Sequence, residues 1–177
     1  MSFLRSLTQV AMIALVVALS SCAGPNLPQS LDELANNSLS QIDGTLEVPG
    51  LREPVEVVRD EWGIPHIYAL NDEDLFFAQG YVMAQDRLWQ MEISRRAGAG
   101  RLSEIFGKRT LAADKYLRGL GIYDSAEASL SHLSEHAKSL IQSYSAGING
   151  YLLSHKGALP LEFVIFNHRP ENWTAAD

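Results

Sequence analysis

The stretch from Asn71 to Arg96 limits the possible folds of this chain more than any other. Its apolar residues recur every three or four positions, which predicts an α-helix that is covered on more than one side. Asn71 or Asp72 can cap the start of this helix, and Gly98 and Gly100 end it. A straight helix of this length spans about 37 Å. The residues expected to be buried are Leu75, Ala78, Val82, Trp89 and Ile93, with Phe76, Met83 and Met91 beside them.

An acid and a base, Asp86 and Arg87, lie next to each other within this apolar pattern. Adjacent side chains on a helix point away from each other, so the two are not expected to pair. We expect Arg87 to hold backbone carbonyls or the carboxylate of Asp60. We expect Asp86 to accept hydrogen bonds from backbone N–H groups or from Arg59. Since no nucleophile with an adjacent base is nearby, the sequence favours a structural role for both residues.

A β-hairpin is predicted just before the long helix. Residues that favour strands flank a four-residue turn, Asp60–Gly63, which contains a turn acid and a glycine. Pro54 and Pro65 suit strand starts or a sheet edge, because proline lacks an N–H donor. His66 is expected to be a structural hydrogen-bonding partner rather than a catalyst. The strand-forming residues are Val55, Val57, Ile64, Ile67 and Tyr68.

The remaining sequence predicts further helices. A short one is expected at Leu102 to Phe106 and a second at Leu111 to Leu120. A stronger helix starts after Ser134 and stops at Gly157. These helices, together with the long helix and the hairpin, indicate a mostly helical α+β chain.

Two kinds of ligand are disfavoured. His132 and His136 lie four residues apart, a spacing that suits a metal ion, but no third ligand is evident and we expect both to be surface polar residues. The formal net charge is -7, and the Lys and Arg residues are scattered. A basic stripe of the kind that binds phosphates is therefore missing, and nucleic acid is not expected as a partner.

The final residues indicate the start of another element. An apolar run from Phe163 to Phe166 is followed by Pro170, and Thr174 can cap a new helix. Because the sequence ends at this start signal, we expect it to be a fragment of a longer chain. By itself the fragment is expected to expose Trp89 and the run Phe163 to Phe166, and to be poorly soluble.

Residues 1–21 are typical of an export signal. Arg5 precedes an apolar run, Val10 to Leu19, that is too short to cross a bilayer. The run leads to Leu19-Ser20-Ser21-Cys22, which resembles the bacterial lipobox, in which the cysteine is acylated and becomes the new N-terminus. We therefore predict lipid attachment at Cys22 and a protein held at the bacterial cell envelope, on the periplasmic side. A plain secretory signal with an incidental cysteine is the alternative.

Residues 22–44 are predicted to be a tether. They contain Pro25, Pro28 and many Asn, Ser and Gln residues, a composition that suits a spacer. A weak helix is expected from Ser30 to Leu39. The folded part is then residues 45–177.

The folded part contains four segments that together resemble one known family. They are TLEVPGL, PVEVVRDEWGIPHIYA, DLFFAQGYVMAQDRLWQMEISRRAGAGRLSEIFG and FNHRPENWTAAD. They are similar to the N-terminal part of the penicillin acylase (penicillin amidase) family of N-terminal nucleophile hydrolases. The resemblance implies a partial αββα sandwich, a four-layer fold to which two chains contribute, and residues 45–177 would be the leading part of the α-chain region.

The resemblance also implies where the chemistry lies. Family members are precursors that cleave themselves into a smaller α chain and a larger β chain. The new N-terminal serine of the β chain attacks an amide carbonyl, with its own α-amine as the base. This serine, the oxyanion-hole groups and the α-chain calcium ligand of the members that bind calcium all lie further on. No catalytic, cofactor-binding or metal-binding residue is therefore expected in this chain, which would be inactive by itself.

The matching residues belong to the framework of the family. They are Arg59, Asp60, Gly63, Pro65, His66, Gln85, Asp86, Arg87, Gln90, Met91 and Glu92.

Two functions remain open. In the first, the chain is the leading segment of a lipid-anchored acylase that hydrolyses a β-lactam amide, an acyl-homoserine lactone or a similar acylated amine. Its partners would be the downstream β-chain part of the same precursor and the small amide substrate. In the second, the chain is complete and is a non-catalytic lipoprotein, such as a binding module.

Overall fold

The computed structural model describes residues 30–155, 157 and 159–177. Its contacts divide the chain into two units, Met1–Asn36 and Asn37–Asp177. The predicted export signal, Cys22 and the first part of the tether lie outside the described residues. The predicted weak helix is present as α2 (Leu31–Asn37). Ser30 and Glu33 cap its start by reciprocal hydrogen bonds of 3.2 and 3.1 Å between backbone and side chain.

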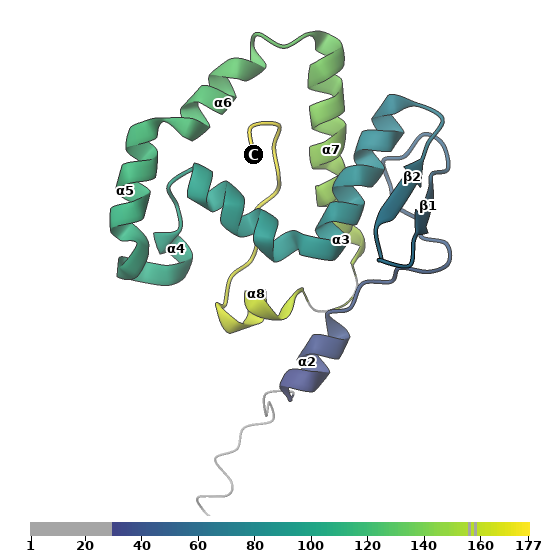
Figure 1. The fold of residues 1–177 in the computed structure, drawn as a ribbon, viewed down its shortest axis with the longest axis horizontal. Coiled ribbons are helices and arrows are strands. Elements are labelled where there is room, and N and C mark those ends of the chain that lie inside the picture. Colours follow the sequence, from purple (N-terminus) through teal and green to yellow (C-terminus); the bar gives the residue numbers. More distant parts are fainter. Residues whose placement is uncertain (1–29, 156, 158) are drawn as a thin grey trace, which may run out of the picture. The chain divides into compact units, whose positions relative to one another are not determined.

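The second unit is mostly helical with one β-hairpin. Figure 1 shows α3 and α7 side by side, with α5 and α6 completing a ring around the last residues of the chain. The predicted helices at 102–106 and 111–120 and the helix after Ser134 are all present, whereas α6 and α8 were not predicted. The elements are β1 (Glu56–Arg59), β2 (Pro65–Tyr68), α3 (Asp72–Gly98), α4 (Ser103–Phe106), the 3-10 turn η1 (Gly107–Thr110), α5 (Leu111–Leu120), α6 (Ile122–Leu130), α7 (Glu135–Ser154) and α8 (Leu161–Ile165).

The two long helices begin at side-chain caps. Asn71 Oδ1 accepts a hydrogen bond of 2.8 Å from the Asp74 N–H at the start of α3. Ser134 Oγ accepts one of 3.2 Å from the Ala137 N–H at the start of α7. Both caps were expected from the sequence, because the first N–H groups of a helix have no partner within it. α7 ends at Ser154, before the predicted stop at Gly157.

The helices α3 and α7 cross at two glycines. A methyl group on Gly80 would lie 2.0 Å from the Tyr144 carbonyl oxygen, and one on Gly147 would lie 1.9 Å from the Phe77 carbonyl oxygen. The two backbones are therefore in direct contact. Around this crossing lies the core, which consists of Ala84, Leu88, Met91, Ile148, Tyr151, Phe163 and Trp173.

The long helix is bent, so the expectation of a straight 37 Å rod is wrong. Arg87 has φ -151° and ψ 34°, which interrupts the helix near its middle. After the bend, the fully or nearly fully buried positions include Leu88, Glu92 and Arg96, at intervals of four. Trp89 and Ile93 are only half-buried, and Trp89 packs against the outside of the core.

The hairpin has the predicted position and turn. β1 and β2 pair antiparallel, with Val57 opposite Ile67 and Arg59 opposite Pro65. In the turn, Asp60 Oδ1 accepts hydrogen bonds of 2.9 Å from two backbone N–H groups, those of residues 62 and 64. Gly63 has φ +75°, a conformation that strains other residues. The acid and the glycine together therefore close the turn.

The predicted exposure of the 163–166 run is only partly correct. α8 is a helix rather than an extended run, so its side chains point in different directions. Phe163 is 2% exposed and packs edge-on against Trp89, with ring centroids 5.0 Å apart. Trp89 also stacks on Phe166 and is half-buried. Val164, Ile165 and Phe166 are exposed.

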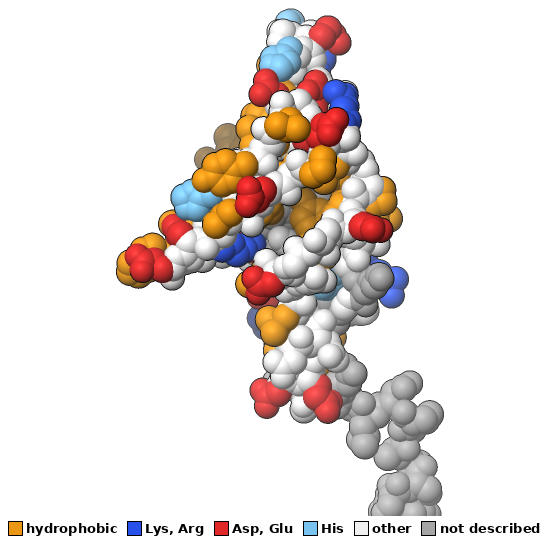
Figure 2. Space-filling model, turned by 90° about the vertical axis from the view of Figure 1, so that its right-hand side faces the viewer, with side chains coloured by type: hydrophobic (Ala, Val, Ile, Leu, Met, Phe, Trp, Pro, Cys, Tyr) orange, Lys and Arg blue, Asp and Glu red, His pale blue; other side chains and the backbone are white. Residues whose placement is uncertain are grey.

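Apolar side chains also reach the surface elsewhere, as the face drawn in Figure 2 shows. Among the described residues, Trp62, Leu70 and Leu153 are each at least 80% exposed. No helix within the described part of the chain is both long and apolar enough to cross a membrane.

The glycine crossing predicts a strong effect of a single methyl group. We expect Gly147→Ala to lower the free energy of unfolding by about 3 kcal/mol or more, because the Phe77 carbonyl cannot rotate away. Gly119→Ala in α5 is the matched control: nothing lies within 4 Å of its added methyl. It should raise stability by about 0.5–1 kcal/mol, since alanine favours helices. Denaturant unfolding measures both, and equal effects would contradict the backbone contact.

Candidate functional site

A groove of about 560 Å³ lies between α3, α6, α7 and the turn at residues 174–177. We call it the central groove. Its walls are largely apolar, with Met83 and Met91 on α3, Ile122 on α6, and Tyr144 on α7. Its polar groups include Arg87, Gln90, Arg95 and Asp177.

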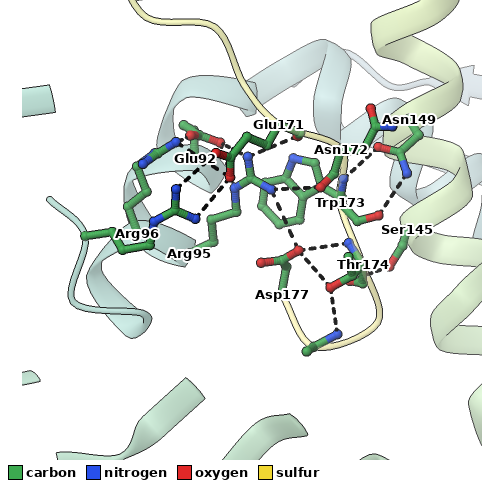
Figure 3. Close-up of polar contacts among 12 residues, drawn as sticks. Glu92, Arg95, Arg96, Ser145, Asn149, Glu171, Asn172, Trp173, Thr174 and Asp177 are labelled. Carbon is green, nitrogen blue, oxygen red and sulfur yellow. Dashed lines mark hydrogen bonds and ion pairs between the residues drawn. The ribbon is translucent and has the colours of Figure 1, made fainter. Parts of the chain in front are cut away.

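Arg95 connects α3 to the segment that enters this groove. Its guanidinium donates hydrogen bonds to the backbone carbonyls of Glu171 (3.0 Å) and Asn172 (3.4 Å). It also lies 4.6 Å from the ring centroid of Trp173, a cation–π contact, and 3.7 Å from Asp177 Oδ2. The side chain is only 6% exposed. Figure 3 shows these contacts converging on Arg95. They fix the path of residues 171–177 along α3.

Glu92 anchors Arg95 from within the protein. It is completely buried, and its Oε2 accepts from Arg95 Nε at 2.8 Å. Its Oε1 accepts from Arg96 Nε at 2.6 Å and lies 2.7 Å from His168 Nε2. A buried carboxylate is costly unless it is paired and hydrogen-bonded, and these partners supply both conditions. Glu92 therefore joins α3 to the segment after α8.

The charged cluster continues towards the surface through Arg101. Arg96 contacts Glu104, and Arg101 donates to Glu104 at 2.8 and 2.9 Å and to Glu171 at 3.0 Å. Hydrogen bonds from Arg101 hold the pKa of Glu104 at about 2, below its ordinary value, although partial burial opposes this shift. They also lower the pKa of Glu171 and raise the pKa of Arg101. Both carboxylates therefore stay charged at neutral pH.

The helix α7 holds the same segment from the other side. Asn149 exchanges two hydrogen bonds with Trp173: its Nδ2 donates to the Trp173 carbonyl (2.9 Å), and its Oδ1 accepts from the Trp173 N–H (2.8 Å). Ser145 Oγ contacts the Ile141 and Thr174 carbonyls at 3.1 and 2.9 Å. A hydroxyl used in this way is structural rather than nucleophilic.

A second set of contacts fastens the hairpin to α3. Arg59 donates to both carboxylate oxygens of Asp86, at 2.8 and 3.1 Å, and to the Gly63 carbonyl at 3.1 Å. Of the two partners expected for Asp86, the structure therefore shows Arg59. Such a two-pronged pair fixes both distance and orientation.

The expected pairing of Arg87 with Asp60 is wrong. Asp60 bonds to its own turn and lies 3.3 Å from His66 Nε2. Its pKa is lowered, chiefly by the Ile64 backbone N–H. Arg87 is exposed at the bend of α3 and lines the central groove, and its guanidinium has no hydrogen bond or ion pair with another side chain or backbone group in the described part of the chain. Arg87 thus lies on the groove side of α3, while its neighbour Asp86 contacts the hairpin.

The six motif residues are thus separated. Arg59, Asp60, Gly63, His66 and Asp86 lie at the hairpin and its contact with α3, and Arg87 lies at the central groove. Their framework role stays a prediction. Within the described ranges, no group of three or more His, Cys, Asp or Glu side chains could hold a metal ion.

Sequence reasoning missed the buried charges. Leu88, Glu92 and Arg96 follow one another at intervals of four, so the last two continue the inward face of α3. That spacing was the available signal. It was not used because charged residues are normally placed outside.

Comparisons with known proteins give a consistent result. A family model described as "Penicillin amidase" matches residues 54–177. The chain is 42% identical over 142 residues to "Penicillin acylase 2 proenzyme" from Pseudomonas sp. (strain SE83), covering 80% of this chain and 18% of that protein. It is 38% identical over 127 residues to "Penicillin G acylase" from Escherichia coli, covering 70% and 15%.

A third relative matches almost the whole chain. It is "Acyl-homoserine lactone acylase QuiP" from Pseudomonas aeruginosa, 32% identical over 176 residues, which cover 99% of this chain and 20% of that protein. Among solved structures, a thermostable penicillin G acylase from Alcaligenes faecalis is similar, with a TM-score of 0.64 and 32% identity. That match covers 70% of this chain and 67% of the other. The chain spans a fifth or less of the length of these three curated relatives.

Breaking the buried pair should destabilise the protein strongly. We expect Glu92→Gln to lower the free energy of unfolding by about 3–5 kcal/mol, because Arg95 and Arg96 would keep their charge without their buried counter-ion. Glu135→Gln is the control, since Glu135 pairs with Lys138 on the surface and is 90% exposed. Denaturant unfolding that shows similar losses for both variants would contradict this role of Glu92.

Acid should weaken the ion pairs of Glu104 in the charged cluster. Because the pKa of Glu104 is lower in the folded protein than its ordinary value of 4.5, its contribution to stability is present above pH 4.5. The contribution is lost as the pH falls towards about 2. The stability difference between the wild type and Glu104→Gln should therefore shrink over this range. Unfolding measured against pH tests this, and a constant difference would rule it out.

Proposed function

The chain belongs to the penicillin amidase family, and on this premise we propose that it is the N-terminal part of a larger amide hydrolase. The observation that carries the proposal is the family match over residues 54–177. The relatives named above are acylases of penicillin or of acyl-homoserine lactones. The proposed substrate is accordingly an acylated amine of this kind, which is hydrolysed to a carboxylic acid and an amine.

The proposed nucleophile is the N-terminal serine of a downstream β chain, which self-cleavage releases. The word "proenzyme" in the name of one relative supports processing of a precursor. The same precursor would complete the αββα sandwich, to which this chain would contribute its helices and its hairpin. Calcium binding by the longer protein stays a prediction, because the ligand implied by the resemblance lies beyond this sequence.

The residues of this chain would act by positioning. An amide hydrolase needs its nucleophile, base and oxyanion donors held in a fixed geometry, and small displacements cost rate. The Arg59–Asp86 pair fastens the hairpin to α3, and the Glu92–Arg95 pair fastens residues 171–177 to the same helix. The bent helix thus supports two separate elements. Neither pair is assigned a role in making or breaking bonds.

The full-length protein tests the enzymatic proposal. We expect it to appear as two chains, the larger beginning with serine, and to release free acid from penicillin G or an acyl-homoserine lactone. Replacing that serine by alanine should abolish both cleavage and hydrolysis, because one group performs both. Protein sequencing and product analysis give the two results. A protein that stays uncleaved, or that keeps its activity without the serine, would refute the proposal.

We also propose that the protein is exported and anchored through lipid at Cys22, as the lipobox-like sequence indicates. Cys22→Ser should then move the protein from the membrane fraction to the soluble fraction, because the acyl chains are lost. Ser21→Ala is the control, since it keeps a small residue before the cysteine. Cell fractionation measures this, and an unchanged distribution of Cys22→Ser would exclude the anchor.

A further inference from the structure

We propose that His168 is a pH-sensitive latch. In its protonated form it holds the segment after α8 to the buried Glu92 of α3, and this attachment weakens when the proton is lost. The latch consists of residues of this chain alone, and it would work whether or not the longer protein hydrolyses an amide.

The end of α8 fixes the position of the His168 ring. The Asn167 N–H donates to the Val164 carbonyl at 3.1 Å, and the His168 N–H donates to the Phe163 carbonyl at 2.9 Å. Asn167 has φ +46°. These two bonds and the left-handed residue between them form a Schellman motif. The motif folds His168 back onto its own helix, where its ring stacks on Phe163 with centroids 6.0 Å apart. Local structure therefore holds the ring in place.

The ring so placed meets a buried carboxylate. His168 Nε2 lies 2.7 Å from Glu92 Oε1. The His168 side chain is 13% exposed and that of Glu92 is fully buried. Arg95 and Arg96 bind the same carboxylate (Figure 3), so Glu92 acts as an acceptor and His168 Nε2 must carry a hydrogen. The imidazolium and one neutral tautomer both meet this condition.

The charge of the surrounding cluster favours the imidazolium. The four carboxylates of the cluster are Glu92, Glu104, Glu171 and Asp177, and its three guanidiniums are Arg95, Arg96 and Arg101. A protonated His168 makes the two charges equal. Burial disfavours a charge on the ring, but an unbalanced negative charge around a buried carboxylate is also costly. The direct contact with Glu92 therefore favours the charged ring.

Other charged groups around the ring keep their charge over the pH range in which histidine changes. Hydrogen bonds from Arg101 hold the pKa of Glu104 at about 2 and lower the pKa of Glu171. From α8 the ring meets an uncharged aromatic side chain, and the next residue, Arg169, is exposed and stays protonated. A change of charge between about pH 5 and 8 is therefore expected at His168.

Loss of this proton should loosen the attachment without abolishing it. The neutral ring can still donate from Nε2, but a charged donor makes a stronger hydrogen bond to a carboxylate. The neutral ring also leaves the cluster with one excess negative charge. A proton that the attached segment binds more tightly than the released segment stabilises the attached form. This stabilisation is present at acidic pH and is lost as the pH rises.

Hydrogen exchange in the full-length protein tests the latch. The N–H groups of Asn167, His168 and Trp173 each donate to an acceptor, so their protection reports how often the segment opens. The protection factor compares exchange with that of an unstructured chain at the same pH. We expect it to fall by about tenfold at these groups between about pH 5.5 and about pH 8.5. The Gly121 N–H, which donates to the Arg118 carbonyl, is the reference and should not change.

Two variants separate the charge of His168 from its hydrogen bond. His168→Gln keeps an N–H donor but carries no charge, so its protection factors should not depend on pH. Glu171→Gln removes the excess acid, so the fall in protection should shift to lower pH. Glu171 is 57% exposed, and its replacement leaves the core unchanged. His132→Gln is the matched control, because His132 is exposed in the turn before α7, and it should keep the wild-type profile.

Several outcomes would overturn the latch. They are constant protection in the wild type, a fall that persists in His168→Gln, and a Glu171→Gln profile identical to that of the wild type. If His168→Gln does not fold, the wild type and Glu171→Gln still decide. An inactive protein with the expected profile would refute the acylase proposal alone, and an active acylase without it would refute the latch alone.

Discussion

The contact between α3 and α7 at Gly80 and Gly147 is the constraint on which the rest of the structure depends. Because neither residue has a side chain, the two backbones meet directly, and a carbonyl of each helix occupies the space that a methyl group would need. This distance brings Leu88 and Ile148 into one core. It also places Arg95 and Asn149 on opposite sides of the same short segment, so that both can bind its backbone.

The charged cluster compensates for the burial of charged side chains that the same helix contact causes. Once α3 is pressed against α7, the inward face of its second half includes Glu92 and Arg96, which are 0% and 3% exposed. Buried charges of this kind contribute little net stability, but they allow few alternative arrangements, since each partner must be present. Here the partners come from α3, α4 and the segment after α8. We interpret the cluster as a device that gives these elements a unique placement rather than extra stability.

The sequence could predict the features that depend on neighbouring residues. The Asp60–Gly63 turn and the caps at Asn71 and Ser134 are local, and each was found where its residues indicated. The partner of Asp86 was also predictable, because Arg59 lies on the strand that precedes the same helix. The bend at Arg87 was not, since no proline or glycine marks it. Gly80 and Gly147 are recognisable in the sequence as glycines inside helical patterns. The fold alone determines which glycines come into contact. The central groove was likewise unpredictable, because its walls bring α3 together with α6, α7 and the turn at residues 174–177, which all follow α3 only later in the sequence.

The glycine crossing also has a consequence for biosynthesis. Roughly 70 residues separate Gly80 from Gly147, and a ribosome adds about 5–20 residues per second, so α3 emerges several seconds before α7 can cover it. During this interval the nascent helix presents its apolar face to the surroundings. An exposed apolar helix face of this kind is a natural binding site for chaperones. The contact between α3 and α7 that fixes the native structure can thus form only after α7 has been synthesised.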